Sequence, residues 1–131
     1  MLTRNSRKTE ANGKMCDNTD YNVVLAGNPN VGKSTIFNAL TGMKQHTGNW
    51  TGKTVEYAKG CTKIKDKSFS VVDLPGTYSM ISFSPEEEVS RQFLVRGDID
   101  CTVIVIDSSV LERNLSFTLQ VLSVTKKAVL C

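Results

Sequence analysis

The chain has 131 residues, 40% of them hydrophobic, with 16 basic and 13 acidic side chains and a net charge of +3. This length predicts one domain, and the balanced charge argues against a nucleic-acid partner. No apolar run approaches the ~18 residues of a membrane-spanning helix, so no span is expected in this chain. The cysteines lack C-x-x-C spacing, which predicts reduced thiols in the cytoplasm and no metal site at Cys16, Cys61, Cys101 or Cys131.

The first half of the chain begins with a polar leader. Residues 1–20 have no hydrophobic period and are predicted to be disordered. A buried strand is expected over Tyr21–Ala26, then a helix from Lys33 to about Thr41 that ends at Gly42. The next segment, 43–53, contains two glycines and no apolar period, and it is predicted to be a mobile loop.

A hairpin is expected next, with strands over Thr54–Cys61 and Ser68–Asp73. The segment 74–83 is predicted to be a loop. After it, Ser84-Pro85-Glu86-Glu87 is a typical helix start, with serine as the N-cap and proline in the first helical position, and the helix is predicted to reach Arg96.

The last elements alternate between strand and helix. The run Cys101–Ile106 is almost wholly apolar, which is typical of a central parallel strand. A helix with a buried leucine stripe is expected to follow, and a final strand begins at Ala128–Leu130. The stripe consists of Leu111, Leu115, Leu119 and Leu122. This alternation predicts an α/β fold with a mostly parallel sheet and helices on both faces.

The strongest chemical signal is Gly27-Asn28-Pro29-Asn30-Val31-Gly32-Lys33-Ser34, which fits the phosphate-loop pattern G-x-x-x-x-G-K-[ST]. It stands between the predicted first strand and first helix, where backbone N–H groups and the helix dipole favour an anion. In such a loop Lys33 reaches the β- and γ-phosphates and the Ser34 hydroxyl is a ligand of Mg²⁺. The chain is therefore predicted to be a P-loop nucleotide-binding protein.

A second signal, Asp73-Leu74-Pro75-Gly76, ends a predicted strand about 40 residues later. An acidic residue there typically contacts Mg²⁺ or its water, and the Gly76 N–H can meet a γ-phosphate. Thr54 is a candidate to close over Mg²⁺. Thr77 stands where many regulatory GTPases have a glutamine that orients water, which predicts slow unassisted turnover, on the order of 10⁻⁴–10⁻² s⁻¹.

These segments, together with Thr47-Gly48-Asn49-Trp50-Thr51-Gly52-Lys53-Thr54-Val55-Glu56 and Leu111-Glu112-Arg113-Asn114-Leu115, resemble the G domain of bacterial ferrous iron transport protein B. The resemblance covers 21–131 and implies a partial Ras-like G domain, incomplete at the C-terminus. It implies GTP or GDP as ligand, slow GTP hydrolysis, Mg²⁺ as cofactor and K⁺ as a second cation. It also implies a membrane transport domain in the same polypeptide and a place on the cytoplasmic face of the bacterial inner membrane.

The resemblance also assigns roles to individual residues. Candidate catalytic residues are Lys33, Thr54 and Gly76. Candidate Mg²⁺ ligands are Ser34, Thr54 and Asp73, and candidate K⁺ ligands are Asn30, Gly48 and Trp50. The full nucleotide-binding set is Gly27, Asn28, Asn30, Val31, Gly32, Lys33, Ser34, Thr35, Trp50, Thr54, Asp73 and Gly76.

The guanine-reading element [NT]-K-x-D does not occur in this chain, so guanine specificity is implied by the resemblance alone. Weak or absent GTPase activity is expected of these 131 residues. Two alternatives remain at this point: a non-catalytic nucleotide-dependent interaction module, and a ribosome-associated GTPase of the same superfamily.

Overall fold

The computed structural model describes residues 18–42, 45–49, 55–81, 84–96 and 98–131. A single six-stranded sheet runs through it in the order β2-β3-β4-β1-β5-β6. Its strands are β1 (Tyr21–Gly27), β2 (Gln45–Asn49), β3 (Glu56–Ile64), β4 (Lys67–Asp73), β5 (Cys101–Val105) and β6 (Ala128–Leu130). The helices are α1 (Lys33–Thr41), α2 (Pro85–Arg96) and α3 (Leu111–Val124), with a short 3₁₀ turn, η1, at Ser108–Val110.

The central part of the sheet is parallel, as the sequence predicts. β1 pairs in parallel with β4 and β5, and β5 with β6, whereas β2 and β3 form an antiparallel edge. The predicted hairpin of β3 and β4 is confirmed. Its tight turn holds Lys65 at φ 55.

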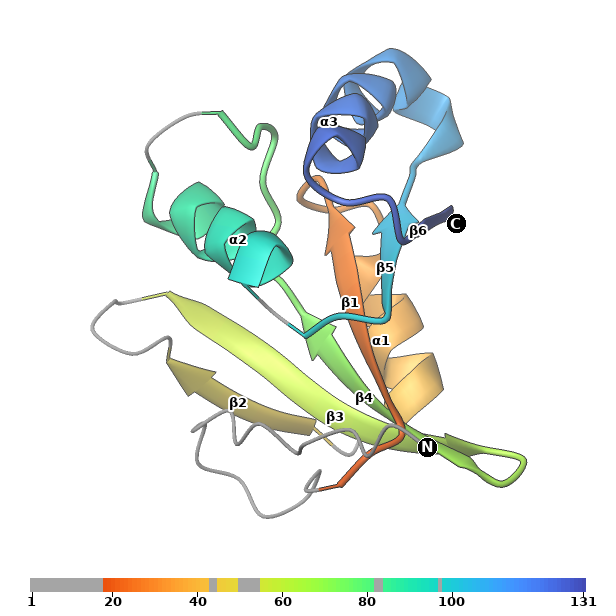
Figure 1. Cartoon of the computed structure of the whole chain (residues 1–131). Coiled ribbons are helices and arrows are strands. Elements are labelled where there is room, and N and C mark those ends of the chain that lie inside the picture. Colours follow the sequence, from red (N-terminus) through yellow and green to blue (C-terminus); the bar gives the residue numbers. More distant parts are fainter. Residues whose placement is uncertain (1–17, 43–44, 50–54, 82–83, 97) are drawn as a thin grey trace.

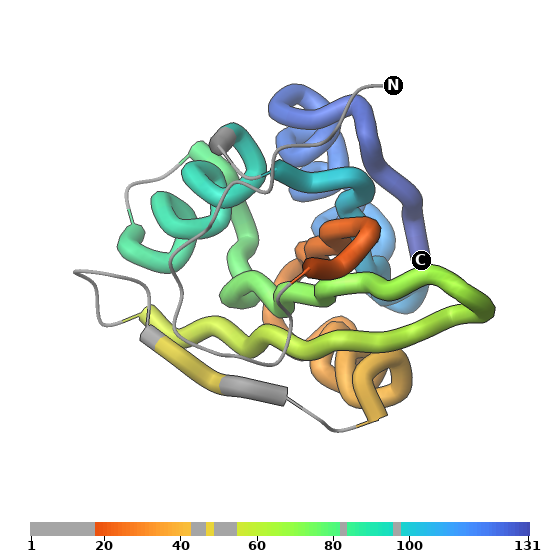
Figure 2. Tube along the Cα trace, turned by 60° about the horizontal axis from the view of Figure 1, so that its bottom comes forward, coloured from red at the N-terminus to blue at the C-terminus, as the bar shows by residue number. Residues whose placement is uncertain are grey.

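Helices cover both faces of the sheet, which confirms the predicted α/β architecture (Figures 1 and 2). On one face, Phe37 of α1 packs with Leu25 and Val71. On the other, α2 and α3 cover a larger core. Its buried members are Val24, Ala26, Val72, Leu74, Met80, Leu94, Ile104, Phe117 and Val121.

The helix boundaries follow local sequence. Gly42 caps α1 in the left-handed conformation, with φ 63, and its N–H bonds to the Asn38 carbonyl oxygen. Ser84 caps α2, because its Oγ accepts a hydrogen bond from the Glu87 N–H at 3.2 Å. Both predicted caps are therefore present.

The predicted loop over residues 43–53 is wrong in part, because Gln45–Asn49 forms β2. This strand gains its backbone partners from β3, with Gly48 opposite Tyr57. Its sequence has no hydrophobic alternation that would predict a strand. The predicted loop also includes residues 43–44 and 50–53, which lie outside the described residues.

The leucine stripe predicted to be buried on α3 is exposed instead. The buried positions of α3 are Asn114, Phe117, Thr118 and Val121. At 3.6 residues per turn, the leucines lie about a quarter turn around the helix from that face. Leu119 is 67% exposed, and the other three leucines are more than 40% exposed.

The cysteine prediction is also wrong at one position. Cys61 is disulfide-bonded, whereas Cys101 and Cys131 are free thiols. Within the described residues, no helix has the length and apolar character needed to cross a membrane.

Candidate functional site

The phosphate loop connects the carboxyl end of β1 to the first turn of α1. Its start is tightly packed, because a Cβ on Gly27 would lie 3.0 Å from the Val105 carbonyl oxygen and 3.1 Å from Val31 Cγ2. Asn30 and Gly32 turn the backbone with positive φ angles of 63° and 93°. The loop therefore makes a tight turn that leads directly into the N-terminus of α1, where unpaired N–H groups favour an anion.

Lys33 ties this loop to the end of β4. Its buried Nζ forms an ion pair with the Asp73 carboxylate. The same Nζ donates a hydrogen bond to the Leu74 carbonyl oxygen at 2.6 Å. The two residues that the sequence assigns to phosphate and Mg²⁺ thus lie in direct contact, and the buried lysine charge is paired.

The segment after Asp73 packs directly on the phosphate loop. A Cβ on Gly76 would lie 2.9 Å from Pro29 Cα, so no larger residue fits without a backbone shift. The Thr77 N–H donates to the Gly27 carbonyl oxygen at 3.3 Å, and the Leu74 N–H donates to that of Leu25 at 3.1 Å. These contacts place Gly76 beside the loop, as the sequence reasoning requires.

Two buried polar side chains at this junction lack hydrogen bonds. Asn28 is 2% exposed, and neither its Oδ1 nor its Nδ2 has a partner in the described part of the chain. The Thr77 hydroxyl is buried and unpartnered among the same residues. Each buried polar group without a hydrogen bond costs about 1–3 kcal/mol. The junction therefore contains hydrogen-bond donors and acceptors that the fold itself leaves unused.

Four of the remaining predicted residues lie in the phosphate loop or the first turn of α1. Ser34 and Thr35 are exposed on the first turn of α1, and Val31 and Asn30 belong to the loop itself. Gly48 lies in β2, separated from β1 by β3 and β4, so the structure does not bring it beside Asn30. Trp50 and Thr54 lie outside the described residues.

The oxygen donors near the loop suit a hard cation. The Ser34 hydroxyl is exposed at the start of α1, and the Asp73 carboxylate ends the neighbouring strand. Hydroxyl and carboxylate oxygens are the ligands that Mg²⁺ takes, usually together with water. No group of three or more His, Cys, Asp or Glu side chains that could hold a metal occurs in the described part of the chain.

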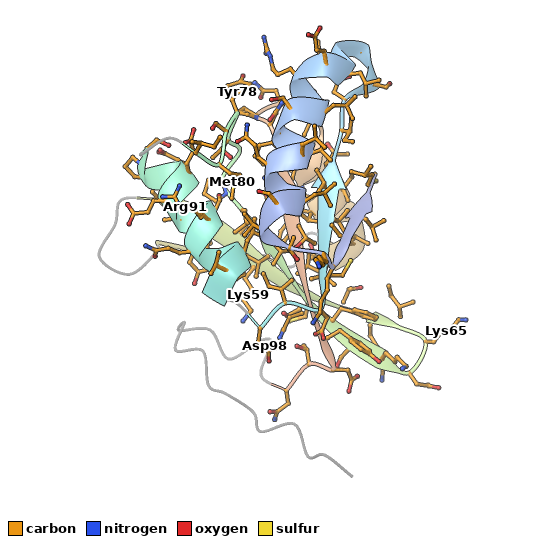
Figure 3. The ribbon with its side chains drawn as sticks, turned by 45° about the horizontal axis from the view of Figure 1, so that its top comes forward. Lys59, Lys65, Tyr78, Met80, Arg91 and Asp98 are labelled. Atoms are coloured by element: carbon orange, nitrogen blue, oxygen red, sulfur yellow. The ribbon has the colours of Figure 1, made fainter. Side chains whose placement is uncertain are left out.

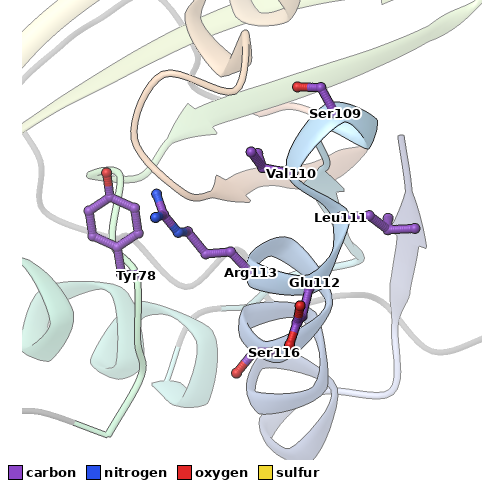
Figure 4. Close-up of a pocket in the computed structure, with 7 residues that line it drawn as sticks. All are labelled: Tyr78, Ser109, Val110, Leu111, Glu112, Arg113 and Ser116. Carbon is purple, nitrogen blue, oxygen red and sulfur yellow. The ribbon is translucent and has the colours of Figure 1, made fainter.

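An open cavity of about 680 Å³ lies next to the segment that follows Gly76 (Figure 4). Its walls are Tyr78, η1 and the first turns of α3. The Arg113 guanidinium stacks on the Tyr78 ring, with its Cζ 5.3 Å from the ring centroid. This cavity was not predicted, since its residues come from two separate segments that carry no known binding pattern.

The wall formed by η1 is fixed by two polar residues. The Asp107 carboxylate accepts hydrogen bonds from the Ser109 hydroxyl at 2.6 Å and from its N–H at 2.9 Å. These bonds hold the pKa of Asp107 below its usual 3.8. Buried Asn114 accepts from the Asp107 N–H at 3.1 Å and donates to the Val110 carbonyl oxygen at 2.9 Å. Asp107 therefore caps η1, and Asn114 joins this cap to α3.

Comparisons with a family model and with known proteins point to the same family. The family model described as ferrous iron transport protein B matches residues 21–131. The Fe(2+) transporter FeoB of Methanocaldococcus jannaschii is 48% identical over 102 residues, which are 78% of this chain and 15% of that protein. The chain thus spans about 15% of the length of this relative.

Solved structures agree in fold. The G domain of the T. maritima FeoB iron transporter matches with a TM-score of 0.81 and 44% identity, covering 84% of this chain and 69% of that one. The cytosolic domain of the same transporter matches with a TM-score of 0.80 and 44% identity in its GMPPNP form, over 84% of this chain and 44% of that one. Its GDP form II gives the same TM-score and identity, over 84% and 43%.

Proposed function

This chain belongs to the ferrous iron transport protein B family, and from that premise we propose that it is a guanine-nucleotide-binding domain of a ferrous iron transporter. The observation that carries the proposal is the direct contact between Lys33 of the phosphate loop and Asp73 at the end of β4. It joins the phosphate-binding and metal-binding residues at one edge of the sheet. The GDP and GMPPNP forms of the T. maritima cytosolic domain support guanine nucleotide as the ligand.

The chemistry of the ligand assigns a role to each side chain. The α1 N-terminus and the Lys33 ammonium would stabilise the β- and γ-phosphates, and Ser34, Thr54 and Asp73 would hold Mg²⁺, which would neutralise phosphate charge. For Lys33 to bind the phosphates, its ammonium must leave the Asp73 carboxylate and pair with a phosphate oxygen instead. Asp73, once released, would face the Mg²⁺ position, where the cation would give its carboxylate a new positive partner.

Hydrolysis is an in-line attack of water on the γ-phosphate, with the Gly76 N–H positioned against a γ-phosphate oxygen. Thr77 offers no amide to orient that water. We infer that a K⁺ ion held by Asn30 and by the backbone of Gly48 and Trp50 supports the reaction. Because β3 and β4 lie between Gly48 and β1, this site requires β2 to move toward the phosphate loop.

The role of the whole protein follows from its family. We propose that the leader 1–20 and the G domain 21–131 work at the cytoplasmic face of a bacterial inner membrane. There, the nucleotide state regulates a transport domain of the same polypeptide, and Fe²⁺ is the cargo. In that protein, this chain contributes the nucleotide-dependent switch.

Phosphate release from GTP, measured in K⁺ and in Na⁺, tests this proposal. We expect slow release with Mg²⁺ present, faster in K⁺ than in Na⁺. If GTP binds and no phosphate is released in either salt, the chain is a nucleotide-binding module and not an enzyme. Equal release in both salts would remove K⁺ from the mechanism.

A further inference from the structure

Beyond the phosphate loop, two helices hold the backbone of Met80 from opposite sides. The Met80 N–H donates to Gln120 Oε1 of α3 at 2.7 Å. The Met80 carbonyl oxygen accepts from Arg91 Nη1 of α2 at 2.9 Å. Figure 3 shows Met80 between the two helices, with Arg91 beside it. We call this arrangement of Gln120, Met80 and Arg91 the Met80 clamp.

Gln120 contributes more to the clamp than one bond. Its Oε1 also accepts a hydrogen bond from the Ser79 hydroxyl at 3.2 Å. The Ser79 oxygen in turn accepts from the Ile81 N–H at 3.0 Å. A carbonyl oxygen has two acceptor sites, so both are used, and a single side chain fixes three consecutive residues.

The clamp is a fixed point in the fold. The Met80 side chain is only 4% exposed and belongs to the larger core. Four residues earlier, Gly76 packs on Pro29, and the Thr77 N–H bonds to Gly27. The short segment between these two attachments contains Tyr78, which is 52% exposed and stacked on Arg113.

We propose that Gln120 is a positioning residue for GTP hydrolysis, which fixes residues 79–81 so that Gly76 is held against the phosphate loop. The inference rests on the proposed function, because it assigns Gln120 to that same reaction. Gln120 contacts no nucleotide and acts through the backbone of residues 79–81. Only Thr77, Tyr78 and Ser79 separate Gly76 from Met80, so a loosened clamp lets Gly76 shift from its place against the phosphate loop.

Three variants test this role. Gln120→Met keeps the length of the side chain and removes the acceptor, which leaves the Met80 N–H buried without a partner. Gln120→Glu retains an acceptor oxygen and serves as the rescue. The matched control is Gln92→Met on α2, because among the described residues the Gln92 amide donates along its own helix, to Glu88 Oε1 at 2.9 Å.

The first measurement is amide hydrogen exchange of residues 79–81 in the nucleotide-free chain. We expect exchange about tenfold faster in Gln120→Met, because the bonds to Gln120 oppose local opening, and near wild-type exchange in the other two variants. Protection in Gln120→Met equal to that in Gln92→Met would overturn the clamp. This measurement needs no nucleotide, so it is independent of the proposed function.

The second measurement separates GTP affinity from turnover. We expect Gln120→Met to lower kcat about tenfold with the Kd for GTP within about twofold of wild type, because the variant disturbs the hydrolytic geometry and not the phosphate loop. Gln120→Glu should retain kcat. An unchanged kcat in Gln120→Met, with GTP bound and hydrolysed by the wild type, would overturn the positioning role. Failure of the wild type to bind GTP would instead overturn the proposed function.

Discussion

The contact between Lys33 and Asp73 is central at the scale of single residues. Each group is mostly shielded from water, so the pair keeps two charges together that would be costly to bury alone. Under the proposed function, a phosphate would offer Lys33, and Mg²⁺ would offer Asp73, a new partner of opposite charge. The ion pair would then separate when the ligand binds.

Gly76 has the least room of the glycines near the site. In Gly76→Ala the new Cβ would meet the backbone of Pro29 at 2.9 Å, so one of the two segments must move. We expect the free energy of unfolding to fall by about 1–3 kcal/mol, as in other overpacked sites, measured by chemical denaturation.

Gly48→Ala is the matched control for that substitution. A Cβ there would lie 3.6 Å from the Tyr57 ring, which is an ordinary contact, and a change within about 0.5 kcal/mol is expected. Equal losses in the two variants would contradict the close approach of Gly76 and Pro29.

Asp107 gives a prediction for pH. Hydrogen bonds from Ser109 hold its pKa below 3.8 in the folded chain, so the folded state favours the ionised carboxylate. The resulting stability is present above pH 3.8 and is lost as the pH falls through the depressed pKa. The wild type should therefore exceed Asp107→Ala in Tm at pH 7, and the difference should shrink below pH 3.8. A difference that grows in acid would contradict this account.

At the scale of elements, patterns with a local cause predicted the structure well. The hydrophobic runs of β1 and β5, the serine cap of α2 and the glycine cap of α1 each depend on residues within a few positions. The glycines, Lys33 and Asp73 were found for the same reason, since a phosphate loop and a D-x-P-G turn are short patterns. Their mutual contact was not predicted; it arises because β1 and β4 are parallel neighbours whose carboxyl ends meet at one edge of the sheet.

Elements with a non-local cause were missed. β2 exists because β3 offers it backbone partners, and the composition of residues 45–49 gives no sign of that. On α3, the leucine spacing predicted the helix correctly but its buried face wrongly, because Phe117 and Val121 pack in the core in place of the leucines. Gln120, Arg91 and Arg113 were missed because their contacts link segments far apart in the chain.

Two substitutions on α3 check which face is buried. Phe117→Ala removes a fully packed ring from the larger core and should lower the free energy of unfolding by about 3–5 kcal/mol. Leu119→Ala removes a side chain that is 67% exposed and should change it by less than about 0.5 kcal/mol. Chemical denaturation of both variants gives the comparison, and a larger loss at Leu119 would contradict the assigned face.

At the scale of the whole molecule, the sheet places every described candidate except Gly48 at the carboxyl ends of its central strands (Figure 1). β1 supplies the phosphate loop, β4 supplies Asp73, and β5 leads to the Asp107 cap. α2 and α3 hold the segment after Gly76 from the other side. The fold thus gathers the candidate phosphate-binding residues and the segment after Gly76 at one edge of the sheet.

Titration calorimetry with GDP and Mg²⁺, on the wild type and on Lys33→Ala, tests the central claim most directly. The account predicts that the wild type binds GDP. The variant should bind GDP at least about tenfold more weakly, because the GDP phosphates lose the buried Lys33 ammonium as a partner. Circular dichroism of both proteins confirms that the variant is folded. GDP affinity that is unchanged in a folded Lys33→Ala variant, or no GDP binding by the wild type, would contradict the account.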